Sequence, residues 1–141
     1  VYSGQIENGG VFGYIQSFRY NETLLTWVTY GNSGHINLRS GKFNIGRNNC
    51  GLRPLTSNID LEYVKYIAEP IFIENVKGEK QKSLPQSIVK KLQIPFPVKP
   101  DGVIDLVAQK ELSNKYKKID LFKKSIVEEL DRIAKTEIDF E

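Results

Sequence analysis

Short runs of apolar and aromatic residues fill the first third of the chain, with turn-forming residues between them. The runs are VFGYIQSF (11–18), TLLTWVTY (23–30), HINLRS (35–40) and KFNI (42–45). Nine of the eleven glycines lie in the first 51 residues, and Gly and Asn tolerate the positive φ that tight turns need. The pattern predicts short strands joined by turns. Trp27, in mid-strand, is expected in the core with its indole N–H bonded to backbone.

Beyond residue 57 the apolar positions recur at helical spacing. The residues on one helical face are Ile59, Tyr63, Tyr66, Ile67 and Ile71. Ser57 or Asn58 is expected to cap this helix, and Pro70 should end or kink it. A second, short helix is expected to open at SLPQ (83–86), a Ser-x-x-Gln capping box, and to continue through Lys91.

A Pro-rich stretch, IPFPVKPDG (94–102), interrupts the periodic pattern, and its prolines exclude a regular helix. It predicts an extended joint between two bodies. We therefore expect a folded domain over residues 1–97, a joint over 98–104, and a long helix with a tail over 105–141. Because the chain opens inside an expected strand and not at a Met, the first domain is expected to lack its N-terminal part.

The last third of the chain predicts one long amphipathic helix. Asp105 can cap it, and about 30 residues to Lys135 at about 1.5 Å each make a rod of roughly 45 Å. Apolar residues follow a heptad pattern, which Lys123 interrupts and Phe122 widens. The members of this helix-pairing seam are Leu112, Tyr116, Ile119, Ile126, Leu130 and Ile133. Such a stripe must be buried, either on a partner helix or by packing back onto the β part.

The fold class is therefore α/β (α+β): a twisted β-rich domain with short helices, followed by a long projecting helix. Residues 1–100 carry 12 Lys and Arg against 7 Asp and Glu, whereas residues 101–141 carry 8 against 10. A mildly basic body permits a polyanionic partner, although an ordinary solvated surface explains the same charge. No stretch approaches the roughly 18 apolar residues of a membrane span. Cys50 is the only cysteine, so a cytoplasmic location without disulfides is expected.

Residues suited to catalysis are scarce. One His and one Cys cannot build a zinc site, and no carboxylate cluster has metal-ligand spacing, so no metal is expected. A Cys50/His35 nucleophilic pair is conceivable across strands, but a lone thiol more often fills the core. Only Glu7 and Glu22 supply carboxylates before residue 58. The pattern favours a recognition surface over an active site, and no catalytic residue is assigned.

The polar residues of the loops are of the types that read DNA. Asn and Gln pair with adenine edges, and Arg and Lys pair with guanine or with phosphates. We expect loops 5–10 and 30–35 to read bases, loop 77–82 to contact bases or phosphates, and Arg39, Lys42 and Arg47 to position phosphates. The candidate contacts are Gln5, Asn8, Tyr30, Asn32, Ser33, His35, Arg39, Lys42, Arg47, Lys77, Lys80 and Lys82. For each single residue, a role in the turn alone is the competing interpretation.

The order of these motifs resembles the target-recognition domain of type I restriction–modification specificity subunits. The segments that carry the resemblance are VYSGQIENGGVFGYIQSF (1–18), LLTWVTYGNSGHINLRSGKFNI (24–45) and NNCGLRP (48–54). LQIPFP (92–97) resembles that family's junction, and DLVAQKELSNKYKKIDLFKKSIVEEL (105–130) resembles its long helix. The resemblance covers most of residues 1–135.

The resemblance implies that the domain reads one half of a bipartite site on double-stranded DNA. Its long helix would pair with that of a second recognition unit and set the spacing between half-sites. A partner subunit or domain would flip and methylate adenine, so S-adenosylmethionine would belong to that partner and this chain would need no cofactor. The same module also ends single-chain enzymes that fuse restriction, methylation and recognition, and both arrangements stay open.

A different class of function fits the heptad pattern equally well. A coiled-coil-dimerising interaction module could present a β domain that binds a peptide or a glycan. Its discriminating observation is the absence of any binding to duplex DNA at low salt, even with the partner methyltransferase present.

Overall fold

The centre of the body is a three-stranded antiparallel sheet in the order β3-β2-β5. A computed structural model describes residues 1–3, 7–11, 13–14 and 16–139 of the chain. The strands are β2 (Leu24–Val28), β3 (Ile36–Arg39) and β5 (Asn49–Leu52). Trp27 on the central strand lies opposite Ile36 on one side and opposite Cys50 on the other. All five residues of β2 are buried, as expected for a strand paired along both edges.

A smaller sheet lies beside the first. It pairs β1 (Tyr20–Asn21) with β4 (Lys42–Phe43), and a 3-10 turn, η1 (Glu7–Gly10), precedes it. The strand expected over 11–18 is wrong: of its described residues, only Val11 forms a bridge, to Tyr2. At the C-terminal end of this segment the Asn44 side chain takes the place of a strand partner. Its Oδ1 accepts from the Arg19 N–H and its Nδ2 donates to the Ser17 carbonyl.

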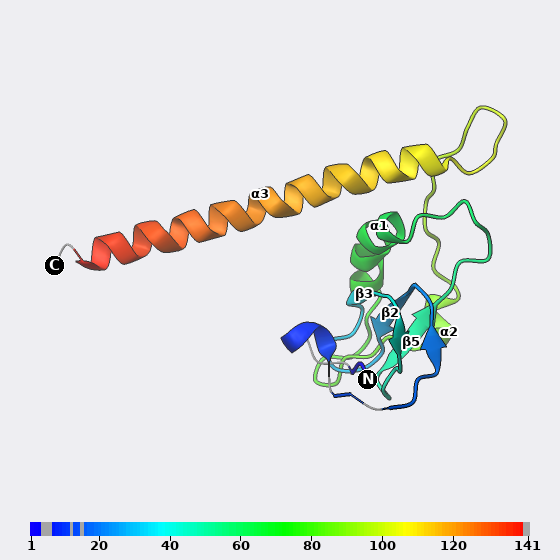
Figure 1. Ribbon diagram of the computed structural model, residues 1–141, viewed down its shortest axis with the longest axis horizontal. Helices are drawn as coiled ribbons and strands as arrows, with labels where there is room; N and C mark the ends of the chain where they lie inside the picture. Colours follow the sequence, from blue (N-terminus) through cyan, green and yellow to red (C-terminus); the bar gives the residue numbers. More distant parts are fainter. Residues whose placement is uncertain (4–6, 12, 15, 140–141) are drawn as a thin grey trace.

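One face of the central sheet is covered by α1 (Leu61–Glu74), which Figure 1 shows lying over β2 and β3. Asp60 caps α1, since its carboxylate accepts from the Tyr63 N–H at 3.2 Å; the expected cap at Ser57 or Asn58 is therefore wrong. Pro70 lies inside α1 and does not end it, so of the two expected effects the end of the helix is wrong. The turn beyond Pro70 is held because Phe72 is buried against the sheet.

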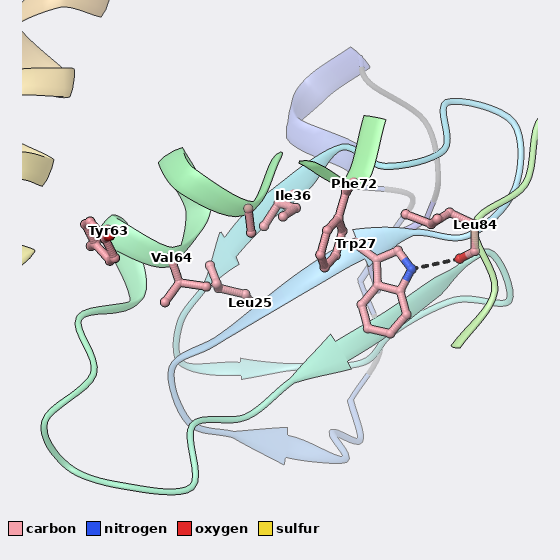
Figure 2. Close-up of a cluster of buried hydrophobic side chains, with 8 residues drawn as sticks. Leu25, Trp27, Ile36, Tyr63, Val64, Phe72 and Leu84 are labelled. Carbon is pink, nitrogen blue, oxygen red and sulfur yellow. Dashed lines mark hydrogen bonds between the residues drawn. The ribbon is translucent and has the colours of Figure 1, made fainter. Parts of the chain in front are cut away.

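The core lies between α1 and the sheet. Its buried members are Leu25, Trp27, Ile36, Tyr63, Val64, Ala68, Phe72 and Leu84. Trp27 and Phe72 meet edge to face with ring centroids 6.0 Å apart. The Trp27 indole N–H donates to the Leu84 carbonyl at 2.9 Å, which confirms the expected bond to backbone (Figure 2).

The segment after α1 is mostly irregular. The short helix α2 (Gln86–Val89) forms, but no side chain caps it. The capping box expected at 83–86 is wrong because the Ser83 backbone pairs with Lys77. Within the expected joint, Val98 and Ile104 form a bridge closed by the Lys99–Val103 hydrogen bond of 2.8 Å.

The chain ends in α3 (Leu106–Asp139), which projects far beyond the body (Figure 1). Asp105 caps it as expected, accepting from the Ala108 N–H at 3.0 Å. Its apolar stripe does not fold onto the sheet. Leu112 packs against the core and Tyr116 stacks on Tyr66 of α1. The seam was expected to be free from Leu112 onward, but its exposed part begins at Ile119. None of the helices in the described part of the chain is both long and apolar enough to cross a membrane.

Candidate nucleic-acid interface

Three loops that are distant in sequence meet at one end of the central sheet. Loop 30–35 connects β2 to β3, and turn 46–48 leads into β5 beside it, because the Thr29 N–H donates to the Asn48 carbonyl at 2.9 Å. Loop 77–83 lies against the same end: the Gly31 N–H donates to the Lys82 carbonyl at 3.1 Å, and the Leu84 N–H to the Thr29 carbonyl at 2.8 Å. We call residues 30–35, 46–48 and 77–83 the loop interface.

Ser33 joins two of these loops through its side chain. Its hydroxyl donates to the Lys82 carbonyl at 2.9 Å, and the residue is only 7% exposed. Tyr30 and Ser83 form a bridge next to this bond. Ser33, predicted as a DNA contact, therefore lies where it fixes one loop against the other, whereas neighbouring Asn32 and Tyr30 are exposed.

The shape of loop 77–83 depends on a glycine. Lys77 and Ser83 exchange two backbone hydrogen bonds of 2.9 Å each, which closes a tight hairpin. Gly78 has φ +94°, and a Cβ added there would lie 2.2 Å from the Gln81 carbonyl oxygen. No other residue fits this position without moving the loop. Three exposed lysines project from the segment: Lys77, Lys80 and Lys82.

A hollow of about 280 Å³ opens between the two loops. Its lining residues are Gly31, Asn32, Ser33, His35, Ile73, Val76, Gly78 and Lys82. The polar groups of Asn32, His35 and Lys82 can donate and accept hydrogen bonds, and an apolar wall made by Ile73 and Val76 stands beside them. Such a site can take a polar, flat group like a base edge, or a phosphate oxygen.

Ile73 and Val76 were not among the sequence-based candidates. They enter the site because loop 30–35 packs on the end of α1, where a Cβ on Gly34 would lie 3.1 Å from the Ile73 Cα. The glycine was a visible signal of close backbone approach, but its partner could not be identified from the sequence.

Arg47, exposed in turn 46–48, joins the loop interface, but other candidates lie apart from it. Gln5 lies outside the described residues. Asn8 belongs to η1, whose Gly9 carbonyl accepts from Arg39 at the end of β3 away from loop 30–35. Lys42 is exposed on β4, with its Nζ 5.0 Å from the centre of the Phe18 ring.

Arg39 does not have the predicted position. It is 6% exposed, its guanidinium lies 3.8 Å from the centre of the Tyr2 ring, and its Nη1 donates to the Gly9 carbonyl at 2.6 Å. Burial lowers the pKa of Arg39. A guanidinium enclosed in this way holds the N-terminal segment on β3, so the expected phosphate contact is corrected to a structural role.

The Cys50/His35 pair is also separated. Cys50 lies on β5 and His35 precedes β3, with β2 between them, so their backbones are roughly two strand spacings, about 9.5 Å, apart. The Cys50 sulfur accepts a hydrogen bond from Gln86 Nε2 at 3.4 Å. Among the described residues, no group of three or more His, Cys, Asp or Glu side chains could hold a metal ion.

Comparison with known proteins identifies the family. Residues 1–132 match the family model of the type I restriction modification DNA specificity domain. The chain belongs to this family. As a DNA specificity domain, it falls in a class whose function is recognition of DNA sequence and not catalysis.

Two similar proteins are much longer than this chain. A Mycoplasma pneumoniae protein named as a type I specificity subunit is 29% identical over 101 residues, which are 69% of this chain and 27% of that protein. The crystal structure of a type I restriction–modification S subunit from M. genitalium superposes with a TM-score of 0.64 at 21% identity, covering 84% of this chain and 30% of that one. The likeness confirms the mixed fold with its long helix, and the chain spans less than a third of either relative.

Proposed function

We propose that this specificity domain binds double-stranded DNA through its loop interface. The observation that carries the proposal is the joining of loops 30–35 and 77–83 by the Ser33–Lys82 hydrogen bond. This bond brings base-reading side chains and a cluster of lysines to one end of the sheet, although the loops lie more than 40 residues apart.

The side chains of the loop interface divide into two chemical roles. Asn32 and His35, at the hollow, carry the donors and acceptors that distinguish base pairs in the major groove. Lys77, Lys80 and Lys82 project from the neighbouring hairpin and suit phosphates, as does the exposed Arg47. Base contacts then supply specificity, and phosphate contacts supply most of the affinity and its salt dependence.

For the wider assembly, we propose the arrangement that the family resemblance implies. The domain reads one half of a bipartite site in the cytoplasm, and α3 pairs with the helix of a second recognition unit through its exposed seam. The exposed seam residues are Ile119, Ile126, Leu130 and Ile133. A partner methyltransferase subunit or domain acts on adenine with S-adenosylmethionine, so catalysis and cofactor belong to the partner. Family membership and the uncovered apolar seam support this proposal.

The phosphate role is tested by Lys80→Ala combined with Lys82→Ala. A preferred duplex is first selected from a random pool, and Kd is then measured on it and on a scrambled duplex across a salt series. We expect weaker binding to both duplexes and a salt slope reduced by about 0.9 for each phosphate that is no longer neutralised. Lys118→Ala with Lys124→Ala, on exposed positions of α3, is the control of equal charge and should leave the slope unchanged.

The base-reading role is tested by Asn32→Ala. We expect the preferred duplex to lose affinity while the scrambled duplex does not, because a bidentate base contact is worth about 1–3 kcal/mol of discrimination. Equal losses on the two duplexes would remove Asn32 from base reading. If the unaltered chain binds no duplex at low salt, even with a partner methyltransferase present, the interaction-module function replaces DNA recognition.

A further inference from the structure

The Pro-rich segment predicts an extended joint between body and rod, yet direct contacts bridge it. The first turns of α3 lie against α1, and Gln109 is fully buried between them, with 0% of its surface exposed. A buried amide requires partners for both its oxygen and its nitrogen. Gln109 has them in the turn that leads into α1.

The amide of Gln109 pairs with backbone groups two residues apart. Its Oε1 accepts from the Asp60 N–H at 2.8 Å, and its Nε2 donates to the Asn58 carbonyl at 2.9 Å. Asp60 is also the N-cap of α1. The first turn of α3 is therefore bonded directly to the start of α1, and a two-point contact of this kind restrains rotation as well as distance.

Further contacts continue along the same side of α3 for two turns. Ser113 is buried, and the Tyr116 ring stacks on Tyr66 with centroids 5.5 Å apart. Lys117 forms an ion pair with Glu62. Beyond Lys117 the described side chains of α3 are exposed. The rod thus leaves the body from a fixed base of about two turns.

Because the exposed part of α3 is long, a small rotation at its base moves its far end by a large distance. From Lys118 to Asp139 it spans about 33 Å at about 1.5 Å per residue. A swing of about 10° at the base would move the far end by about 6 Å, close to two base steps of about 3.4 Å each. A rod that sets the distance between two recognition units must therefore be held firmly at its base.

We propose that Gln109 is a positioning residue that fixes the direction of α3 relative to the loop interface, so that rod and body form one rigid unit. The consequence for half-site spacing rests on the proposed function. The rigidity itself does not, because it is a property of the chain without DNA.

The test measures the distance between spin labels on the body and on the rod. Labels are placed by Asn48→Cys, in the loop interface, and Ser125→Cys, on α3, with Cys50→Ser in every variant. We expect a single narrow distance distribution for the parent chain and at least twofold broadening for Gln109→Ala. Gln109→Glu keeps the acceptor for the Asp60 N–H but loses the donor to the Asn58 and Asp105 carbonyls and places a carboxylate oxygen against them, so broadening is expected in this variant as well. Asn114→Ala, exposed on the same helix, is the control and should match the parent.

Several results would overturn the proposal. They are a broad distribution in the parent chain, an unchanged width in a folded Gln109→Ala or Gln109→Glu variant, and loss of folding in both variants, which would make Gln109 a folding residue. Affinity for a single selected duplex provides the separating measurement. It should stay within about twofold in Gln109→Ala, since the loops are untouched. Absence of DNA binding in the parent would contradict the proposed function and leave the distance result standing.

Discussion

Gly78→Ala should weaken DNA binding strongly while lowering the unfolding free energy only modestly. The substitution deforms the hairpin of residues 77–83, which carries three lysines, and leaves the core unchanged. An alanine at φ +94° is strained by about 1–2 kcal/mol. Its Cβ would also lie 2.2 Å from a backbone oxygen, so the Lys77–Ser83 pair must open. Each broken hydrogen bond adds about 0.5–1.5 kcal/mol at most, and an exposed loop can recover part of this with water. We expect a loss of about 2 kcal/mol in unfolding free energy.

The substitution should also change the salt dependence of DNA binding. If all three lysines lose their positions, the salt slope falls by up to about 2.7, at about 0.9 for each phosphate that a lysine neutralises. The assay is Kd against salt concentration on a selected duplex, with urea unfolding measured in parallel. Gly102→Ala is the matched control, because Gly102 has φ +84° but nothing within 4 Å of an added Cβ, and it lies in the joint. A Gly78→Ala chain that binds DNA like Gly102→Ala, with the same salt slope, would show that the hairpin lysines do not contact phosphates.

Two further substitutions test the packing around the site. Trp27→Phe keeps a ring near Phe72 but leaves the buried Leu84 carbonyl without its donor. The unfolding free energy, measured by circular dichroism, should therefore fall by about 1–3 kcal/mol. An unchanged unfolding midpoint would contradict the role of that bond. The hydrogen bonds from Arg53 hold the pKa of Glu22 below its ordinary value. The pair therefore stabilises the fold at any pH above the pKa that Glu22 has in the unfolded chain, and this contribution is lost as the pH falls through the pKa of the folded state. In Arg53→Ala the Glu22 carboxyl should titrate at higher pH by carbon NMR, whereas identical titration curves would exclude the pairing.

Local patterns were sufficient for the elements whose period is built into a few turns of chain. The Asp105 cap and the apolar stripe that follows it predicted α3, and the run around Trp27 predicted β2, because helix and strand periods repeat within the segment itself. The errors occurred where a distant partner competed with a local signal. Ser83 pairs with Lys77 through its backbone and does not form the expected capping box, and the Asn44 side chain replaces a strand partner for residues 17 and 19.

The candidate site shows the same division. The residue types in the loops, and their suitability for DNA, can be read along the chain. Folding in three dimensions was needed to show that loops 30–35 and 77–83 meet through Ser33, that Arg39 is enclosed beneath the N-terminal segment, and that Gln109 bonds the rod to the cap of α1. These contacts join residues 30 to 49 positions apart along the chain, and no periodicity of helix or strand extends that far.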